Sequence, residues 1–386
     1  MSEELERHGR EEYSLNLLGK LPKLENTKQF RRTDFFFIHL YFQLSLEGMG
    51  SFPEFLNDSS IHDGPGAKVP LPWAGFITLS LLMAVFSITA VVLNATVIVV
   101  TLRHKQLRQP LNFALVNLAV ADLGITLTGS VPSVVTNALG YYIMGRVGCV
   151  LEGFCVALFG ITALCTVALI AVERLFVVCK PLGTIKFQTK HAAGGLLLSW
   201  LWSLVWNSPP LFGWGSYQLE GAGTSCGPDW QNRDRKNVSY IICYFSLCFA
   251  VPFLIIVVSY SWLLYTLRKV AKVGGRVAAR AESKVAWMVV MMVLAFLVSW
   301  LPYAALALTV VINPDVQLAV TVKVVPIYMA KSSTVYNPLI YIYMNKQFQK
   351  YAVPFLMCGR DPWPSEDDAS DLQTVVSPMN NKINPE

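Results

Sequence analysis

The amino-acid sequence predicts an all-α membrane protein, a bundle of seven transmembrane helices followed by a short amphipathic cytoplasmic helix. Of the 386 residues, 54% are hydrophobic and only 15% are charged, and the mean hydropathy is +0.46. Soluble domains average roughly 45–50% apolar and about 25% charged residues. Seven apolar segments have the length that crosses a bilayer, and they lie at 74–101, 111–138, 148–179, 192–213, 240–266, 285–312 and 320–344.

Basic residues mark the predicted cytoplasmic side of this bundle. They gather between spans one and two, after span three, before span six and after span seven. Because cytoplasmic loops carry an excess of Lys and Arg, we expect the N-terminus outside and the C-terminus inside. Two N-glycosylation sequons, at Asn57 and Asn237, fall on the predicted outer side and agree with this orientation.

The charge distribution and the cysteine spacing argue against a nucleic-acid-binding protein and against a metal-binding protein. The net charge of +6 is spread without a dense basic face, so we expect no nucleic-acid partner. The eight cysteines include no C-x-x-C pair and no His/Cys spacing typical of metal ligands, so we expect no metal site.

The chain divides into four parts. We expect residues 1–73 to be a disordered extracellular segment, residues 74–344 the transmembrane domain and residues 345–357 the amphipathic helix. Residues 358–386 are polar and acidic, which predicts a disordered cytoplasmic tail. Its hydroxyls are either phosphorylation sites or part of an inert solubilising tail; the candidates are Ser365, Ser370, Thr374 and Ser377.

One lysine lies inside an apolar span, where ionisable groups are costly and are candidates for function. Lys331 is in the outer third of span seven, and Glu152 is near the outer end of span three, at a similar depth. Each alone would pay a desolvation penalty of several kcal/mol, so we expect them to pair. A buried lysine loses its proton readily and can form a Schiff base, for which Glu152 would be the counterion. The alternatives are a structural ion pair or a lysine that snorkels outward.

Three further charged residues lie at the inner ends of spans three and six. Glu173 and Arg174 end span three, and Glu282 begins span six on the same side. A contact between Arg174 and Glu282 could hold these helix ends together; ordinary interfacial charges are the alternative.

Aromatic and proline residues are placed where they can shape a pocket. Trp300 precedes Pro302 by two residues and Tyr303 follows it, and aromatics near a proline kink can line a pocket between helices, although plain packing is the alternative. In span seven, "NPLIY" sets Asn337 beside Pro338, so the Asn337 amide can bond the carbonyls that the proline frees.

Cys149 and Cys226 occupy outer loop positions, in a compartment that permits disulfides. A bridge between them would pin the loop after span four across the mouth of the bundle. Glu220 lies six residues before Cys226, so this bridge would bring a second carboxylate near the pocket.

The combination of motifs resembles a known family. Seven spans together with Asn94, "LAVADL", the Glu-Arg pair, "WLPY" and "NPLIY" are similar to the rhodopsin-like G-protein-coupled receptors, over about residues 70–357. Lys331 in "AKSSTVYNP" and Glu152 in "CVLEGF" narrow the resemblance to the opsins. Segments such as "NSPPLFGWGSYQLEG" and "MNKQFQKYAVPFLMCGRDPW" look most like non-visual opsins of the pineal complex.

The resemblance implies a role for particular residues. Lys331 would bind retinal as a Schiff base, 11-cis in the dark and all-trans after light, with Glu152 or Glu220 as counterion. The retinal pocket would include Gly160, Phe249, Trp300 and Tyr303. Cys149 and Cys226 would form the disulfide, and Cys358 would be palmitoylated. The activation switch would comprise Asp122, Glu173, Arg174, Glu282, Asn337, Pro338 and Tyr341.

The implied function is that of a light-sensing receptor rather than an enzyme. It would activate a heterotrimeric G protein of the inhibitory or transducin class from the plasma or photoreceptor membrane, and its tail would bind arrestin and a receptor kinase. Leu175 stands where tyrosine usually follows the arginine, and the N-terminal extension has no counterpart in the family pattern. Three alternatives remain: a receptor for a diffusible ligand, a transporter or proton-translocating pigment, and a retinal photoisomerase.

Overall fold

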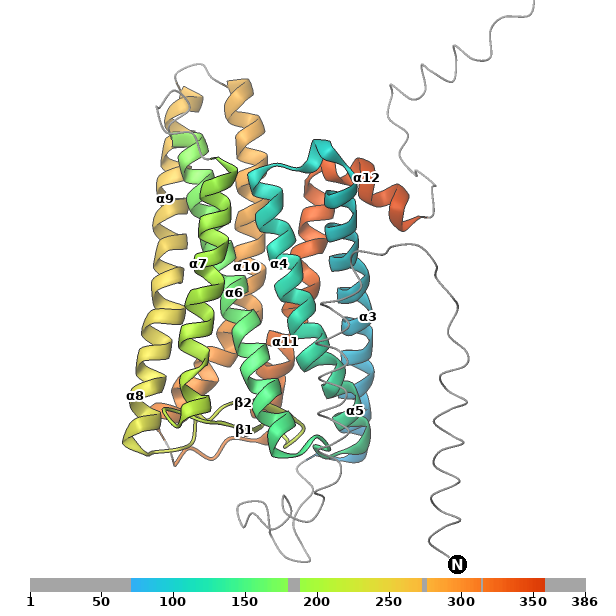
Figure 1. Cartoon of the computed structure of the whole chain (residues 1–386), viewed down its shortest axis with the longest axis vertical. Helices are drawn as coiled ribbons and strands as arrows, with labels where there is room; N and C mark the ends of the chain where they lie inside the picture. The colour runs from blue at the N-terminus through green and yellow to red at the C-terminus, as the bar shows by residue number, and fades with distance from the viewer. Residues whose placement is uncertain (1–70, 180–187, 273–275, 314, 358–386) are drawn as a thin grey trace, which may run out of the picture. The chain divides into compact units, whose positions relative to one another are not determined.

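The computed structural model describes residues 71–179, 188–272, 276–313 and 315–357 (Figure 1). These residues form long helices and one small strand pair. The helices are α3 (Trp73–Arg103), α4 (Pro110–Ile125), α5 (Val131–Leu139), α6 (Gly145–Cys179), α7 (Thr189–Asn207), α8 (Arg235–Tyr244), α9 (Val251–Lys272), α10 (Arg276–Ile312), α11 (Val320–Met344) and α12 (Lys346–Leu356). Short 3-10 helices lie at η2 (Lys105–Leu107) and η4 (Pro209–Phe212).

Two of the seven spans contain a π-helical segment. In the second span, η3 (Thr126–Ser130) joins α4 to α5, and in the fifth, η5 (Phe245–Ala250) joins α8 to α9. Each π-helical segment is followed within two residues by a proline, Pro132 or Pro252. Proline lacks an N–H, so the regular hydrogen-bond ladder is interrupted where these bulges occur.

The predicted seven-span bundle is confirmed, with shifts at some ends. The fourth helix ends at Asn207 rather than near residue 213, because Pro209 and Pro210 cannot donate to the helical ladder and the chain turns into η4. The fifth begins at Arg235, five residues earlier than expected. In the described part of the chain, five spans are long and apolar enough to cross a membrane by length and composition alone, and α7 and α11 are not among them.

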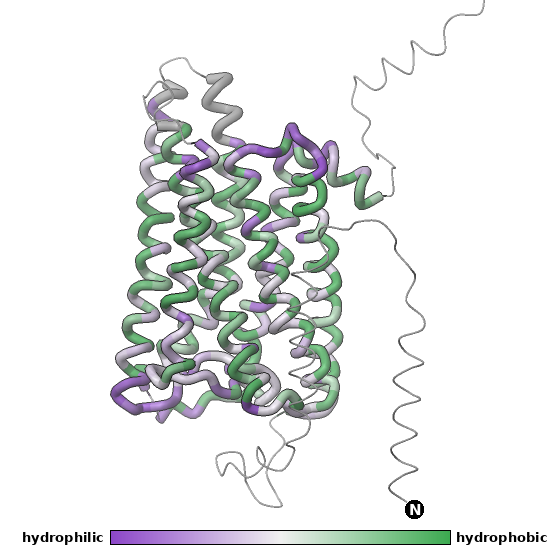
Figure 2. Tube along the Cα trace, in the orientation of Figure 1, coloured by the Kyte–Doolittle hydropathy of each residue, from purple (hydrophilic) through white to green (hydrophobic). Residues whose placement is uncertain are grey.

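Hydrophobic residues predominate along the helices, and hydrophilic residues gather at the helix ends (Figure 2). Side chains such as Leu81, Leu198 and Val258 are more than half exposed in the absence of lipid. The bundle interior combines large apolar groups with small and polar ones; Leu118, Ile170 and Met292 are buried in its main core. An apolar exterior around a partly polar interior is the pattern expected of membrane helices.

A β-hairpin covers the end of the bundle at which α5 ends and α6 begins (Figure 1). Its antiparallel strands are β1 (Tyr217–Glu220) and β2 (Ser225–Pro228), and both contact α6. From the sequence we expected only a loop at this position. Gly221 and Gly223 both have positive φ, which favours glycine and allows the tight turn between the strands.

Candidate functional site: a buried lysine beneath a tethered hairpin

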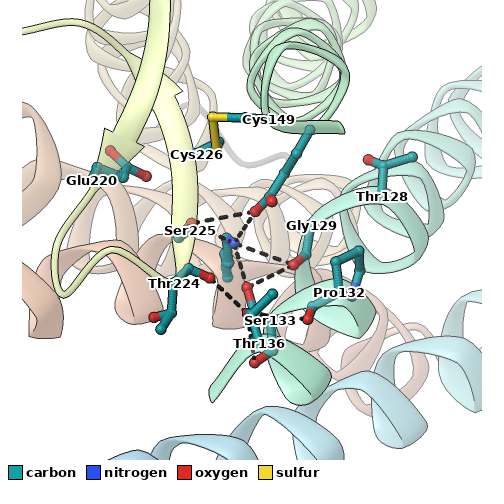
Figure 3. A network of polar contacts seen from close by, with 12 residues as sticks. Thr128, Gly129, Pro132, Ser133, Thr136, Cys149, Glu220, Thr224, Ser225 and Cys226 are labelled. Carbon is teal, nitrogen blue, oxygen red and sulfur yellow. Dashed lines mark hydrogen bonds and ion pairs between the residues drawn. A yellow bond between two sulfur atoms is a disulfide. The ribbon is translucent and has the colours of Figure 1, made fainter. Parts of the chain in front are cut away.

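Lys331 extends from α11 into the bundle and is only 3% exposed. Its Nζ donates to Glu152 Oε1 at 2.9 Å, Ser133 Oγ at 2.7 Å, Ser225 Oγ at 2.8 Å and Gly129 O at 3.2 Å (Figure 3). An ammonium group carries three N–H bonds, so each of its donors has an acceptor among these four oxygens. The buried positive charge is therefore compensated by one carboxylate and three neutral oxygens.

Glu152 lies on α6 and is fully buried. Its Oε1 accepts hydrogen bonds from Lys331 and, at 3.3 Å, from Ser225 Oγ. Its Oε2 has no hydrogen-bond partner among the described residues. The ion pair expected from the similar depth of Lys331 and Glu152 is thus present, and it leaves one carboxylate oxygen able to accept a further hydrogen bond.

Gly129 and Ser133 bring the second span close enough to reach Lys331. Gly129 lies in the π-helical segment η3, and a Cβ atom added there would lie 2.5 Å from Val156 Cγ2 on α6. The missing side chain therefore permits close packing against α6, with the Gly129 carbonyl facing Nζ. Ser133 is one helical turn further along, in α5.

The hairpin supplies the remaining polar groups and is covalently tethered. Cys149 at the start of α6 forms a disulfide with Cys226 in β2, across a sequence separation of 77 residues. Both cysteines are buried. Ser225 directly precedes Cys226, so the disulfide positions the Ser225 hydroxyl beside Lys331 (Figure 3).

We expect Cys226→Ser to lower the free energy of unfolding by about 2–4 kcal/mol, because it releases a long loop in the unfolded chain. Thermal unfolding of the purified protein in detergent measures the change. Cys243→Ser is the matched control, because Cys243 is a free cysteine on α8. Equal melting temperatures for Cys226→Ser and the unmodified chain would contradict the prediction.

Glu220 is the second carboxylate of the site, on β1. Its Oε2 accepts a hydrogen bond from Tyr303 OH at 2.8 Å, and Tyr303 OH accepts one from Trp230 Nε1 at 3.1 Å. Burial raises the pKa of Glu220 to about 7, although the Tyr303 hydrogen bond and the Lys331 charge oppose this rise. Glu220 can therefore change its charge near neutral pH, unlike an ordinary carboxyl group.

An apolar cavity lies between the hairpin and the helices. Lys331, Glu220 and all four predicted pocket residues line it; these four are Gly160, Phe249, Trp300 and Tyr303. The empty space between its lining atoms is about 840 Å³, including the part open to solvent, and pockets for small ligands span roughly 300–1,000 Å³. The Trp300 indole packs over Gly160, where an added Cβ atom would lie 2.9 Å from the ring.

The residues predicted for the activation switch make contacts at different places in the bundle. Arg174 forms an ion pair with its neighbour Glu173, and Tyr341 OH donates to Asn112 Oδ1 at 2.9 Å. Glu282 lies outside the residues whose side chains the structure describes, so its predicted contact with Arg174 stays a prediction.

The Asn337 side chain makes a different hydrogen bond from the one expected. Its Nδ2 donates to Asp122 Oδ2 at 3.3 Å, whereas we expected it to bond backbone carbonyls freed by Pro338. The neighbouring helix α4 presents the buried Asp122 side chain at this level, and the Asn337 amide donates to it.

The predicted modification sites have different outcomes. Asn237 is 3% exposed, and its Nδ2 donates to Asp229 O at 2.7 Å and Asn232 O at 3.0 Å. In this conformation the nitrogen that would carry a glycan is enclosed, which argues against glycosylation there. Asn57 and Cys358 lie outside the described residues.

Three neutral residues that contact Lys331 were not predicted from the sequence: Gly129, Ser133 and Ser225. Serines and glycines are common in membrane helices and carry no charge pattern, so no signal marks Gly129 or Ser133. Ser225 could have been found from its position beside Cys226.

Comparison with known proteins agrees with this geometry. Residues 93–341 match the family described as 7 transmembrane receptor (rhodopsin family), which is the class that the fold and site define. Parapinopsin of Ictalurus punctatus is 54% identical over 338 residues, covering 86% of this chain and 97% of that protein. Pinopsin of Columba livia is 46% identical over 302 residues, covering 78% and 86%. The chain therefore belongs to the opsins.

A solved structure supports the same assignment. The crystal structure of squid rhodopsin superposes with a TM-score of 0.70 at 27% identity, and the match covers 80% of this chain and 93% of that one. The chain is thus an integral membrane protein of the photoreceptor class of G-protein-coupled receptors, and it is not an enzyme.

Proposed function

We propose that this opsin is a non-visual light-sensing receptor that carries retinal on Lys331 and activates an inhibitory or transducin-class G protein when illuminated. One observation carries the proposal: a buried amine, paired with a buried carboxylate at 2.9 Å, lies on the wall of an apolar cavity. A structural ion pair alone would not need a cavity beside it.

The residues present fit retinal, a long apolar chain that ends in an aldehyde. Aromatic and aliphatic side chains suit the chain, and Lys331 supplies an amine for the aldehyde. The unpartnered Glu152 Oε2 offers a hydrogen-bond acceptor beside the attachment point. When bound, 11-cis in the dark, retinal supplies absorption of light and a change of shape to the all-trans form.

Lys331 and its partners perform the attachment chemistry. The ammonium would have to give up a proton before its nitrogen could bond to the aldehyde carbon, whose oxygen would leave as water, and Glu152 Oε1 is an acceptor at hydrogen-bonding distance. Afterwards the same carboxylate can balance a positive charge on the nitrogen, in a site where burial strengthens the interaction. The hairpin, tethered by the Cys149–Cys226 disulfide, limits the access of water from outside.

Trp300 and Tyr303 connect the cavity to α10. Both line the cavity, and Pro302 lies between them inside the helix, where a kink can act as a hinge. A change of shape in the cavity would favour an arrangement with the inner end of α10 moved outward. To shift the equilibrium substantially, the two shapes must differ by several kcal/mol in their preference for that arrangement.

The cytoplasmic face would then engage its partners. Arg174 at the inner end of α6 is positioned to contribute to the G-protein site, and the tail beyond residue 357 would bind arrestin and a receptor kinase. The excess of basic residues supports a cytoplasmic location for this face, with the hairpin and the N-terminus outside.

Reconstitution with 11-cis-retinal tests the proposal. We expect the purified protein to yield, after borohydride reduction, a peptide with a retinyl group on Lys331, as detected by mass spectrometry. Illumination is expected to raise nucleotide exchange on an inhibitory-class G protein at least about tenfold, which corresponds to a shift of roughly 1.4 kcal/mol.

The alternatives give other outcomes. A receptor for a diffusible ligand would form no adduct, and a photoisomerase would turn over free retinal in the light without nucleotide exchange. A proton-translocating pigment would produce a light-driven current in reconstituted vesicles. Any of these three results would replace the proposal.

A further inference from the structure

A second polar cluster lies beside the Lys331 site and has no role in the chemistry described above. It comprises Thr136 and Asn137 on α5, Thr224 in the hairpin and Tyr328 on α11, and we call it the Asn137 cluster. Tyr328 precedes Lys331 by three residues, and Thr224 directly precedes Ser225. The cluster is thus adjacent in sequence to two of the groups that meet at the lysine.

The hydrogen bonds of the Asn137 cluster join three elements. Asn137 Nδ2 donates to Tyr328 OH at 2.6 Å, and Asn137 Oδ1 accepts from Thr224 Oγ1 at 3.0 Å and from Tyr328 OH at 2.9 Å. Thr136 Oγ1 donates to the Thr224 carbonyl at 2.7 Å (Figure 3). Thr136, Asn137 and Thr224 are each at most 1% exposed. Each of these four hydrogen bonds joins the turn of the hairpin to α5 or links α5 to α11.

Apolar contacts reinforce the same attachment. Ala222 and Tyr328 pack against a small core formed by Leu71, Phe76 and Val324. A Cβ atom added at Gly221 would lie 2.9 Å from Ile327 Cδ1, so the turn lies directly on α11.

The hairpin therefore has two attachments, one on each side of Ser225. Cys226 is bonded covalently to α6, and Thr224 is held by hydrogen bonds to α5. Each strand has only four residues, and an isolated two-stranded hairpin is marginally stable at best. Without the Asn137 cluster, the disulfide would retain β2 but the turn could separate from the helices.

We infer that the Asn137 cluster holds the turn of the hairpin over Lys331 and thereby sets the rate at which water and small nucleophiles reach the retinal linkage. The inference rests on the proposed attachment of retinal. The residues of the Asn137 cluster are positioning residues, because they contact the hairpin and the helices rather than the reacting atoms. Access requires a local opening, whose population depends on the contacts that opening breaks.

Hydroxylamine measures this access in the dark. Its nitrogen bonds to the linkage carbon while the carbon–nitrogen bond to Lys331 breaks, so retinal leaves as an oxime and the lysine regains a free amine. We expect Thr224→Val and Tyr328→Phe to accelerate loss of the pigment roughly five- to tenfold, the effect of removing one buried hydrogen bond. The absorption maximum before hydroxylamine addition is expected to stay unchanged.

Two matched variants separate hydrogen bonding from general damage. Thr224→Ser keeps the hydroxyl and is expected to retain the unmodified rate within about twofold. Tyr336→Phe removes a tyrosine hydroxyl from the same helix, whose hydrogen-bond partner in the described part of the chain is Ser332, and should have no effect. Misfolded molecules carry no pigment and do not enter the measured rate.

A second readout needs no retinal. Hydrogen–deuterium exchange of residues 217–228 in the free chain should be faster in Thr224→Val and Tyr328→Phe than in Thr224→Ser and Tyr336→Phe. Unchanged exchange and unchanged hydroxylamine rates in the first two variants would overturn the inference. Failure of the unmodified chain to form any pigment would overturn the proposed function instead, and the exchange measurement would still decide on the cluster.

Discussion

Lys331→Ala is expected to abolish covalent retinal attachment, reducing the borohydride-trapped adduct and the light-minus-dark difference spectrum to background. Lys331 is the lysine that lines the cavity, and its nitrogen is the group positioned for a bond to an aldehyde. Lys323→Ala on the same helix is the control, because that side chain is partly exposed and lies outside the cavity lining. Retention of the adduct in Lys331→Ala would disprove the attachment site.

Lys331→Ala is also expected to lower the free energy of unfolding, because it breaks the buried Lys331–Glu152 ion pair. It leaves the fully buried Glu152 carboxylate without its cation, and breaking a buried ion pair costs about 3–5 kcal/mol. Adding Glu152→Gln removes the unpaired charge, so the double variant should be more stable than Lys331→Ala alone. Thermal unfolding of the free chain measures both. A double variant that is less stable than the single variant would contradict this account.

The bundle itself was predictable from residue chemistry. Long apolar segments and the distribution of basic residues depend on the solvent properties of a bilayer, and these constraints act on each segment separately. The pairing of Lys331 with Glu152 was predictable for a similar reason, because two costly charges at one depth stabilise each other. Helix ends were less certain, and the Pro209-Pro210 pair at the end of α7 shows that local proline chemistry decides them.

The neutral part of the site was not predictable in the same way. Ser133 and Ser225 reach Lys331 only because a π-helical segment and a hairpin position them, and both depend on packing between distant segments. The Asp122–Asn337 hydrogen bond likewise joins residues 215 positions apart. Single-segment patterns carry no information about such contacts, whereas the four residues that the family resemblance implied for the retinal pocket all line the cavity.

The second prediction with a large expected effect concerns which carboxylate, Glu152 or Glu220, balances the positive charge on the Lys331 nitrogen. Glu152 contacts Lys331 directly, whereas Glu220 accepts a hydrogen bond from Tyr303, and both of these residues line the cavity. Ser225 links Lys331 to Glu152, since it accepts from Lys331 and donates to Glu152. We therefore expect Glu152 to be the main counterion in the dark and Glu220 to substitute for it only when ionised.

This difference predicts the pH dependence of the visible band in Glu152→Gln. The pKa of Glu220 is raised to about 7 by burial, so Glu220 is neutral in mild acid and ionised in mild alkali. In Glu152→Gln, the linkage loses its proton and its visible band as the pH rises, but ionised Glu220 should keep the linkage protonated to a higher pH than in the variant that lacks both carboxylates. Removing Glu152 also removes a nearby negative charge that raises the Glu220 pKa, so Glu220 should ionise at or slightly below pH 7 in this variant.

Absorption spectra of the dark pigment across the neutral pH range test this expectation. Glu220→Gln should keep its visible band across this range, because Glu152 remains adjacent to the nitrogen. The double variant should lose its visible band at the lowest pH, since no carboxylate then balances the charge. If instead Glu152→Gln matched the unmodified protein and Glu220→Gln lost the band, Glu220 would be the counterion and the direct contact of Glu152 would belong only to the free lysine.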